Sequence, residues 1–180
     1  MTAKTHILGG VLAGELLCAA ASAPVDNAAV LLAAAAAGAL LPDIDHHNSK
    51  VSRSSKAGRV ASSVACALTT HRGVIHTPVF ILLCGAVLGA LSFFADGLPG
   101  GALIAGLLVG MLSHLVLDSL NPSGIMWLWP VSRKRIRFAK IRTSSPFEWL
   151  VTAALLALVV GFAARFLPEL VEQIRDLAGA

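Results

Sequence analysis

The side chains in this sequence that are best suited to chemistry are histidines and aspartates grouped in a few short segments. All six histidines lie near the ends of apolar stretches. The group comprises His6, Asp43, Asp45, His46, His47, His71, His76, His114 and Asp118. Imidazole and carboxylate ligands without thiolates favour zinc, manganese or iron over copper(I) or an iron–sulfur cluster. Because these donors outnumber the ligands of one tetrahedral ion, they predict a cluster of two or more divalent ions, with zinc as the leading candidate.

Two pairs in this group have spacings that predict how they would share a ligand. His114 and Asp118 are four residues apart, so on a helix they lie on one face and either hold one ion or hydrogen-bond to each other. Asp43 and Asp45 are two residues apart, which suits a bridging carboxylate and its neighbour only where the chain leaves helical geometry. Carboxylates at a helix C-terminus are unfavourable, so a nearby cation is expected to compensate them.

A glycine between two further histidines predicts a change of direction in the chain. His71 and His76 are five residues apart and would diverge on a regular helix, so Gly73 is expected to mark a junction between a loop and a helix. Arg72 has two interpretations, because a guanidinium can pair with a substrate phosphate or anchor to lipid phosphate. His47 is interpreted as a solvated neighbour rather than a ligand.

Two glutamates are treated separately from this group. Glu15 is nine residues from His6 and points to the opposite side of a straight helix, where a protonated carboxyl can donate a hydrogen bond between helices. Glu148 opens the last apolar run. It is either a carboxylate favoured by the helix dipole or a contributor to the site.

The elements that must position these residues are predicted to be membrane-spanning helices. Hydrophobic residues make up 56% of the sequence and charged residues only 13%, outside the balance of a water-soluble domain. Apolar runs cover residues 7–22, 28–41, 77–95, 101–120 and 147–167. The last three meet the length of roughly 20 residues that crosses a bilayer, and the second reaches it as one helix over residues 25–45. The predicted fold class is all-α, a polytopic bundle of about five transmembrane helices in a single domain over residues 1–180.

The distribution of basic residues predicts the orientation of this bundle. With five spans, one face holds twelve of the 14 Lys and Arg residues and leaves only Arg165 and Arg175 for the other. Short loops rich in Lys and Arg stay in the cytoplasm, so the N-terminus is predicted inside and the C-terminus outside. On this topology the histidines and aspartates of the group all lie at cytoplasmic ends of spans. Residues 55–70 are predicted to add a short interfacial helix there.

The basic loop 133–142 raises the question of an anionic partner. A net charge of +4 is compatible with nucleic-acid binding, but the basic residues lie in juxtamembrane loops among apolar and aromatic residues. Around Trp127, Trp129, Ile136 and Phe138 the loop has the composition of an interfacial segment. The predicted partners are membrane lipids, with anionic headgroups at the 133–142 loop, and no nucleic acid is expected. Ordinary positive-inside bias is the alternative explanation.

The N-terminal apolar run has a second interpretation as a secretory signal, since Lys4 precedes it and small residues 21–23 follow it. Glu15 within the run and Pro24 directly after it do not suit such a signal. Cleavage would also discard His6. The run is therefore interpreted as the first span.

Three segments and the start of the chain together resemble a known family. They are Gly38-Ala39-Leu40-Leu41-Pro42-Asp43-Ile44-Asp45-His46, His71-Arg72-Gly73-Val74-Ile75-His76-Thr77 and Ser113-His114-Leu115-Val116-Leu117-Asp118-Ser119-Leu120-Asn121-Pro122-Ser123-Gly124, preceded by Thr5-His6. In order and spacing, over about residues 5–148, they resemble the YdjM-like family of membrane-bound metal-dependent hydrolases, some described as LexA-regulated. More distantly, they are similar to bacterial zinc-dependent phospholipase C and P1-type nucleases.

The family resemblance implies a hydrolase at the inner membrane, and the distant resemblance implies a phosphoester substrate. Carried over by motif, the metal ligands are His6, Asp43, Asp45, His46, His71, His76, His114 and Asp118. The resulting hypothesis is hydrolysis of a phosphate ester, either a phospholipid or a lipid-linked intermediate, at the cytoplasmic interface. Asp45 is expected to position the water or accept its proton, and Arg72 to hold the phosphate. Side chains of His6, Asp43, His76, His114 and Asp118 should converge on a common centre.

Two other classes of function would use the same residues. Buried His and Asp in spans can form a metal-ion or proton transport pathway, or a structural metal can hold the helices together. A transporter should carry polar groups across the bilayer midplane, whereas here the outer halves of the runs are apolar apart from Glu15. Removing a structural metal would unfold the protein, whereas a catalytic site would survive as a folded apo-protein without activity.

Overall fold

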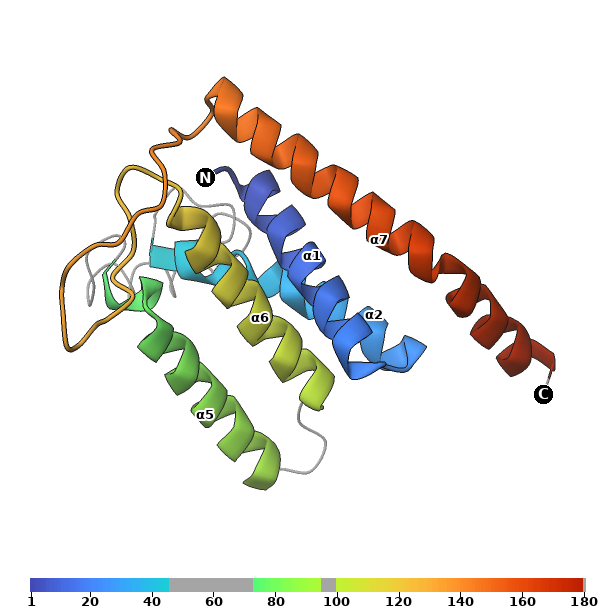
Figure 1. Ribbon diagram of the computed structural model, residues 1–180. Helices are drawn as coiled ribbons and strands as arrows, with labels where there is room; N and C mark the ends of the chain where they lie inside the picture. The colour runs from blue at the N-terminus through green and yellow to red at the C-terminus, as the bar shows by residue number, and fades with distance from the viewer. Residues whose placement is uncertain (46–72, 95–99, 180) are drawn as a thin grey trace.

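The chain folds as a bundle of α-helices in a computed structural model that describes residues 1–45, 73–94 and 100–179 (Figure 1). Its helices are α1 (Ala3–Ala21), α2 (Val25–Gly38), α5 (Pro78–Phe94), α6 (Gly101–Asp118) and α7 (Pro146–Gly179), with short 3-10 turns η1 (Leu41–Asp45) and η2 (Val74–His76). Within these ranges there is no β-strand, only one isolated bridge between Ile125 and Ile136. The all-α prediction is confirmed for the described residues.

Each of the five predicted apolar runs forms a helix, but the second run does not continue as one helix over residues 25–45. The α-helix α2 ends at Gly38, and the chain then turns through η1. This break takes Asp43 out of regular helical geometry, which the spacing of Asp43 and Asp45 required of a site. The predicted interfacial helix at residues 55–70 lies outside the described residues.

Two segments of the described helices are long and apolar enough to cross a membrane, Gly101–Asp118 and Pro146–Ala164. Asn27–Asp43 and Pro78–Phe94 are apolar but shorter. The sequence predicts that the third run, residues 77–95, also reaches full length, but the helix described there is 17 residues long. Lengths in this bundle therefore do not by themselves establish five spans.

Small residues bring α1, α2 and α6 into close contact. Gly10 and Gly14 on α1 are four residues apart, as are Gly106 and Gly110 on α6, and all four face Ala35 or its neighbours on α2. A Cβ added at Gly110 would lie 2.1 Å from the Ala35 carbonyl oxygen, so only glycine fits there. In lipid, helices associate through such close packing because lipid tails are as apolar as leucine side chains.

The bundle is polar inside at one end and apolar outside. Among the described residues, the buried polar side chains belong to the start of α1, the start of α5 with η2, the end of α6 and its following loop, and the start of α7. They are Thr5, His6, His76, Thr77, His114, Asp118, Ser119, Asn121 and Glu148. Large apolar side chains instead face outward along α5 and α7, for example Leu82, which is 72% exposed, and Trp149, which is 71% exposed. Exposed apolar surface of this extent is typical of a protein surface that contacts another protein or the interior of a bilayer.

The connection from α6 to α7 folds back over the polar end of the bundle (Figure 1). Its backbone is tied to the end of α6, because Phe138 N–H donates to the Ser119 carbonyl at 2.8 Å and Ile141 N–H to Leu120 at 2.9 Å. The Trp127 indole N–H donates to Ser119 Oγ, and its ring packs on the small core around Met111 and Leu115. Trp127 is thus a packing residue of this loop.

Candidate metal centre

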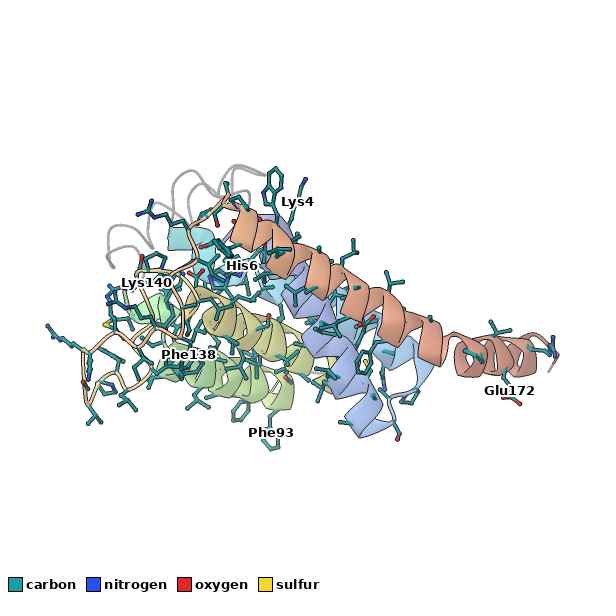
Figure 2. The ribbon with its side chains drawn as sticks, turned by 45° about the horizontal axis from the view of Figure 1, so that its top comes forward. Lys4, His6, Phe93, Phe138, Lys140 and Glu172 are labelled. Atoms are coloured by element: carbon teal, nitrogen blue, oxygen red, sulfur yellow. The ribbon has the colours of Figure 1, made fainter. Side chains whose placement is uncertain are left out.

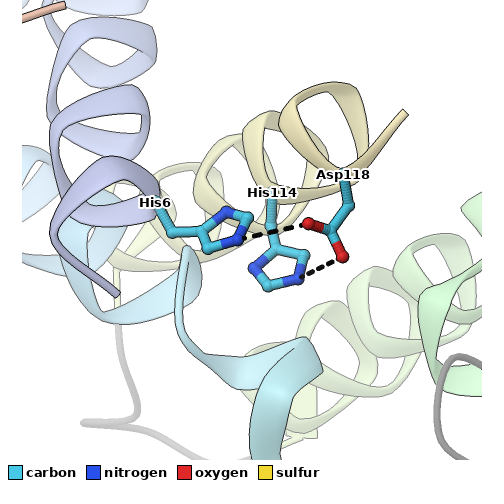
Figure 3. Close-up of side chains that lie close together, drawn as sticks. All are labelled: His6, His114 and Asp118. Atoms are coloured by element: carbon cyan, nitrogen blue, oxygen red, sulfur yellow. Dashed lines mark ion pairs between the residues drawn. The ribbon is translucent and has the colours of Figure 1, made fainter. Parts of the chain in front are cut away.

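Five of the predicted ligands come together at the polar end of the bundle. His6 lies one turn into α1, and Asp43 and His76 lie in the turns η1 and η2. His114 and Asp118 occupy the last turns of α6. Figure 3 shows the His6 ring beside the His114 ring, with both imidazoles facing the Asp118 carboxylate. The two rings are stacked, with centroids 3.8 Å apart and an interplanar angle of 14°.

These side chains make two overlapping groups of three. One contains His6, His114 and Asp118, and the other contains Asp43, His76 and His114. Within each group the ligand atoms all lie within 4.8 Å of one another. His114 is the member common to both groups.

The separations between these atoms suit ligands of a shared cation. His6 Nε2 lies 3.4 Å from Asp118 Oδ1, and His114 Nε2 lies 3.8 Å from Asp118 Oδ2 and 3.7 Å from Asp43 Oδ1. His76 Nε2 lies 3.8 Å from the same Asp43 oxygen. Two ligands at 2.0–2.1 Å from a tetrahedral ion are about 3.3–3.4 Å apart, whereas direct N–H···O bonds are about 2.7–3.2 Å. A small contraction of the observed cage would therefore fit a divalent ion.

The tautomer of His114 is set by the backbone of the neighbouring helix. Its Nδ1 lies 2.7 Å from the Ala39 carbonyl oxygen, which can only accept a hydrogen bond. The neutral imidazole therefore carries its proton on Nδ1 and keeps a lone pair on Nε2. That Nε2 is buried and has no hydrogen-bond partner among the described residues. A metal-ligating histidine has this arrangement, with the second ring nitrogen bonded to a carbonyl or carboxylate.

Asp118 is held in place by its neighbours. Asn121 Nδ2 donates to Asp118 Oδ1 at 2.6 Å, and the Met1 amine lies 2.9 Å from the same oxygen. Oδ2 is the atom directed at His114. The asparagine was not predicted as a site residue, although its position three residues after Asp118 in a helical turn was a readable signal.

Asp43 provides the accessible side of the centre. Its side chain is 26% exposed, whereas those of His76 and His114 are fully buried. Partial burial of Asp43 in η1 raises the pKa of its carboxyl, but the nearby imidazoles of His76, His114 and His6 lower that pKa to about 2. The carboxyl is therefore an anion near neutral pH, the form that binds a cation.

Glu148 clamps the start of α1 to the start of α7. Its Oε1 accepts from the Thr2 backbone N–H and from Thr5 Oγ1, the latter at 3.0 Å, and its Oε2 accepts from the Ser144 N–H. Ser145 Oγ accepts from the Glu148 N–H in turn, as in a capping box. Of the two interpretations from sequence, the contacts support the helix-terminus role, and they add a link to the segment that carries His6.

Several predicted residues cannot be placed in this centre. Asp45 is described only as part of the η1 backbone, and His46, His47, His71 and Arg72 lie outside the described residues. Gly73 precedes η2 and marks the junction before His76, as predicted. No described contact joins Glu15, on the fourth turn of α1, to the centre.

Comparison with known proteins identifies a family whose model matches the chain and relatives that are similar to it. A family model described as YdjM inner membrane protein matches residues 1–171. The chain is 37% identical over 159 residues to the uncharacterized protein YvsG of Bacillus subtilis, covering 86% of this chain and 89% of YvsG. It is 35% identical over 96 residues to the inner membrane protein YdjM of Escherichia coli, covering 51% of this chain and 44% of that protein. No solved structure matches the chain.

Proposed function

The chain belongs to the YdjM inner membrane protein family, and from that premise we propose that it is a metal-dependent hydrolase of phosphate esters. The observation that carries the proposal is the buried Nε2 of His114, which has its ring orientation fixed by Ala39 and faces two carboxylates at 3.7 and 3.8 Å. A buried nitrogen lone pair between two carboxylate oxygens is unfavourable unless a cation lies among them.

The donor set supports zinc, with manganese and iron as alternatives. Three imidazoles and two carboxylates without a thiolate are borderline to hard ligands. His114 has only one lone pair facing the centre, so it can bind a single ion, although it belongs to both groups. The described residues therefore support at least one ion. The second ion expected from the sequence depends on Asp45, His46 and His71.

The chemistry follows from the residues that surround such an ion. A bound divalent ion supplies positive charge that acidifies water and stabilises the phosphoryl oxygens in the transition state. Asn121 holds Asp118, and Ala39 holds His114, so both are oriented before substrate binds. In hydrolysis the water oxygen bonds to phosphorus while the ester P–O bond breaks. One water proton passes to a carboxylate, for which we propose Asp45, and the departing alcohol takes up a proton.

The proposed location of this reaction is the cytoplasmic face of the inner membrane. Successive helices alternate in direction, so that the start of α1, the end of α6 and the start of α7 lie at one end (Figure 1). The Lys and Arg residues of the described loops gather at this same end, in the connection from α6 to α7. The positive-inside rule then supports a multi-pass protein with the N-terminus inside and the C-terminus outside. Arg72 is proposed to hold the substrate phosphate.

The test combines metal analysis with hydrolysis assays on detergent-purified protein. Wild-type protein should contain at least one divalent ion per chain and hydrolyse at least one member of a phosphoester panel. Asp43→Asn should lose both properties. The matched control is Glu172→Gln, which changes an exposed carboxylate on the far part of α7 (Figure 2) and should keep both. Wild-type protein that binds no metal would refute the proposal, and bound metal without turnover would reassign the centre to structure or transport.

A further inference from the structure

An apolar groove runs away from the candidate metal centre between α5 and α6. It has a volume of about 300 Å³, at the lower end of the range for ligand sites. Leu41 of η1 lines it, together with Cys84 and Val87 on the α5 wall and Leu107 and Met111 on the α6 wall. No polar surface lines it.

The groove and the centre share η1 and α6, and α5 follows directly after η2, which carries His76. Leu41 lies in η1 two residues before Asp43, and the α5 wall begins two turns after His76. On α6, Leu107 lies seven residues before His114 and eleven before Asp118, and Met111 lies three and seven residues before them, so all four share one face of the helix. The groove therefore extends from the Asp43, His76 and His114 group down α6 for about 10 Å.

The surroundings of the polar end suit an anionic group. The connection over residues 119–145 carries six basic residues and no acidic residue, and it lies over the end of α6 (Figure 1). A ligand that fits both ends must therefore be anionic at its head and aliphatic behind it.

We propose that the ester hydrolysed at this centre carries a long aliphatic chain, and that this chain lies in the groove between α5 and α6. The inference rests on the proposed function and narrows its substrate to lipid-like phosphoesters. It also explains why α5 packs on the bundle mainly through its first turns, where Phe80, Ile81 and Cys84 meet the small core. On the same helix the groove-lining Leu83 and Val87 remain 58% and 50% exposed.

The kinetic test compares two substrates that share a leaving group. Methyl para-nitrophenyl phosphate and dodecyl para-nitrophenyl phosphate both release para-nitrophenol when the same P–O bond is hydrolysed. In one fixed maltoside detergent, Val87→Trp should raise KM for the dodecyl ester by about tenfold or more, because each methylene removed from the groove loses its burial. KM for the methyl ester should not change. The control Leu82→Trp places the same bulk on the lipid-facing side of α5, outside the groove, and should change neither.

A binding test separates this inference from the proposed function. Cys84 lines the groove, whereas Cys18 lies on α1 away from it. Dodecylphosphonate should slow maleimide labelling of Cys84 at least several-fold and leave Cys18 unchanged, and methylphosphonate should protect neither. If neither ester is hydrolysed, the proposed function is wrong. Protection of Cys84 by dodecylphosphonate then still shows whether the groove binds an aliphatic chain. Equal effects of Val87→Trp on both esters, or no protection of Cys84, would overturn the groove assignment. If Val87→Trp changes the oligomeric mass and leaves KM for both esters unchanged, the groove is a contact between two copies of the chain, and the groove assignment is overturned.

Discussion

The strongest prediction concerns His114, the one side chain shared by both groups of candidate ligands. His114→Ala removes a donor from the His6 and Asp118 group and from the Asp43 and His76 group at once. Loss of a residue that only supports a ligand weakens metal binding about 10–100-fold, so loss of this ligand should cost about 100-fold or more. Metal affinity should fall further in His114→Ala than in any other single variant of the centre.

The size of the effect can be expressed as metal-dependent stability. A ligand at 100 times its Kd stabilises a folded protein by about 2.7 kcal/mol. If Kd rises 100-fold at the same metal concentration, the stabilisation falls to about 0.4 kcal/mol. The assay is denaturant unfolding in detergent with and without added zinc, and the measured quantity is the difference between the two conditions. This difference excludes the cost of losing the bond from His114 to Ala39, because that cost is the same in both.

Two further variants make this measurement specific. Ser113→Ala alters the adjacent residue, whose hydroxyl donates to the Gly110 carbonyl within α6, and should keep the full zinc-dependent increment. Asn121→Ala removes the amide that holds Asp118 and should give an intermediate value. If His114→Ala keeps the wild-type increment, then no cation binds at Nε2 and the proposed centre is wrong.

Three other changes should give measurable results. Gly110→Leu should destabilise the protein by about 1–3 kcal/mol or more, because its Cβ would meet a backbone oxygen of α2; Gly89→Leu, which has open space around it, should leave the unfolding midpoint unchanged, and equal midpoints for the two would contradict the packing. Glu148→Ala should cost about 1–3 kcal/mol for each hydrogen-bond donor left unmatched and also weaken zinc binding, and an unchanged zinc affinity would mean that the clamp does not position α1. Cysteines introduced by Lys4→Cys and Arg175→Cys should be labelled from opposite sides of membrane vesicles, with Lys4→Cys reacting on the cytoplasmic side. Labelling of both from one side would refute the topology.

The sequence predicted the helices because apolar runs have a strong and local signal. It also predicted which residues gather at one end, since alternating helices return His6, His76, His114 and Asp118 to the same face. The prediction of one helix over residues 25–45 missed the turn η1, although Gly38 and Pro42 are residues at which α-helices commonly end. The spacing of Gly106 and Gly110 is typical of a helix that packs closely on another helix. Only the structure identifies α2 as the helix that they contact.

The supporting contacts of the centre were mostly beyond sequence reasoning. The bond from His114 to the Ala39 carbonyl involves a backbone atom and a residue 75 positions away, so no side-chain pattern encodes it. The contact of Thr5 with Glu148 spans 143 positions. Glu148 could be identified at the start of a helix from Ser145, Pro146 and its own position, but not as the residue that fixes α1.

The distribution of buried polar groups bears on whether the centre serves hydrolysis or transport. A pathway through a membrane needs polar side chains at successive depths. Every fully buried polar residue in the described ranges lies instead at one end of the bundle, and the helices beyond it pack through glycine, alanine and leucine. Glu15 is the single carboxyl deeper along α1, and no described contact joins it to the centre. Among the described residues, Asp43 gives the centre a partly exposed side and an apolar groove lies beside it on α5 and α6. This arrangement at one end of the bundle favours chemistry on a bound molecule over passage of an ion.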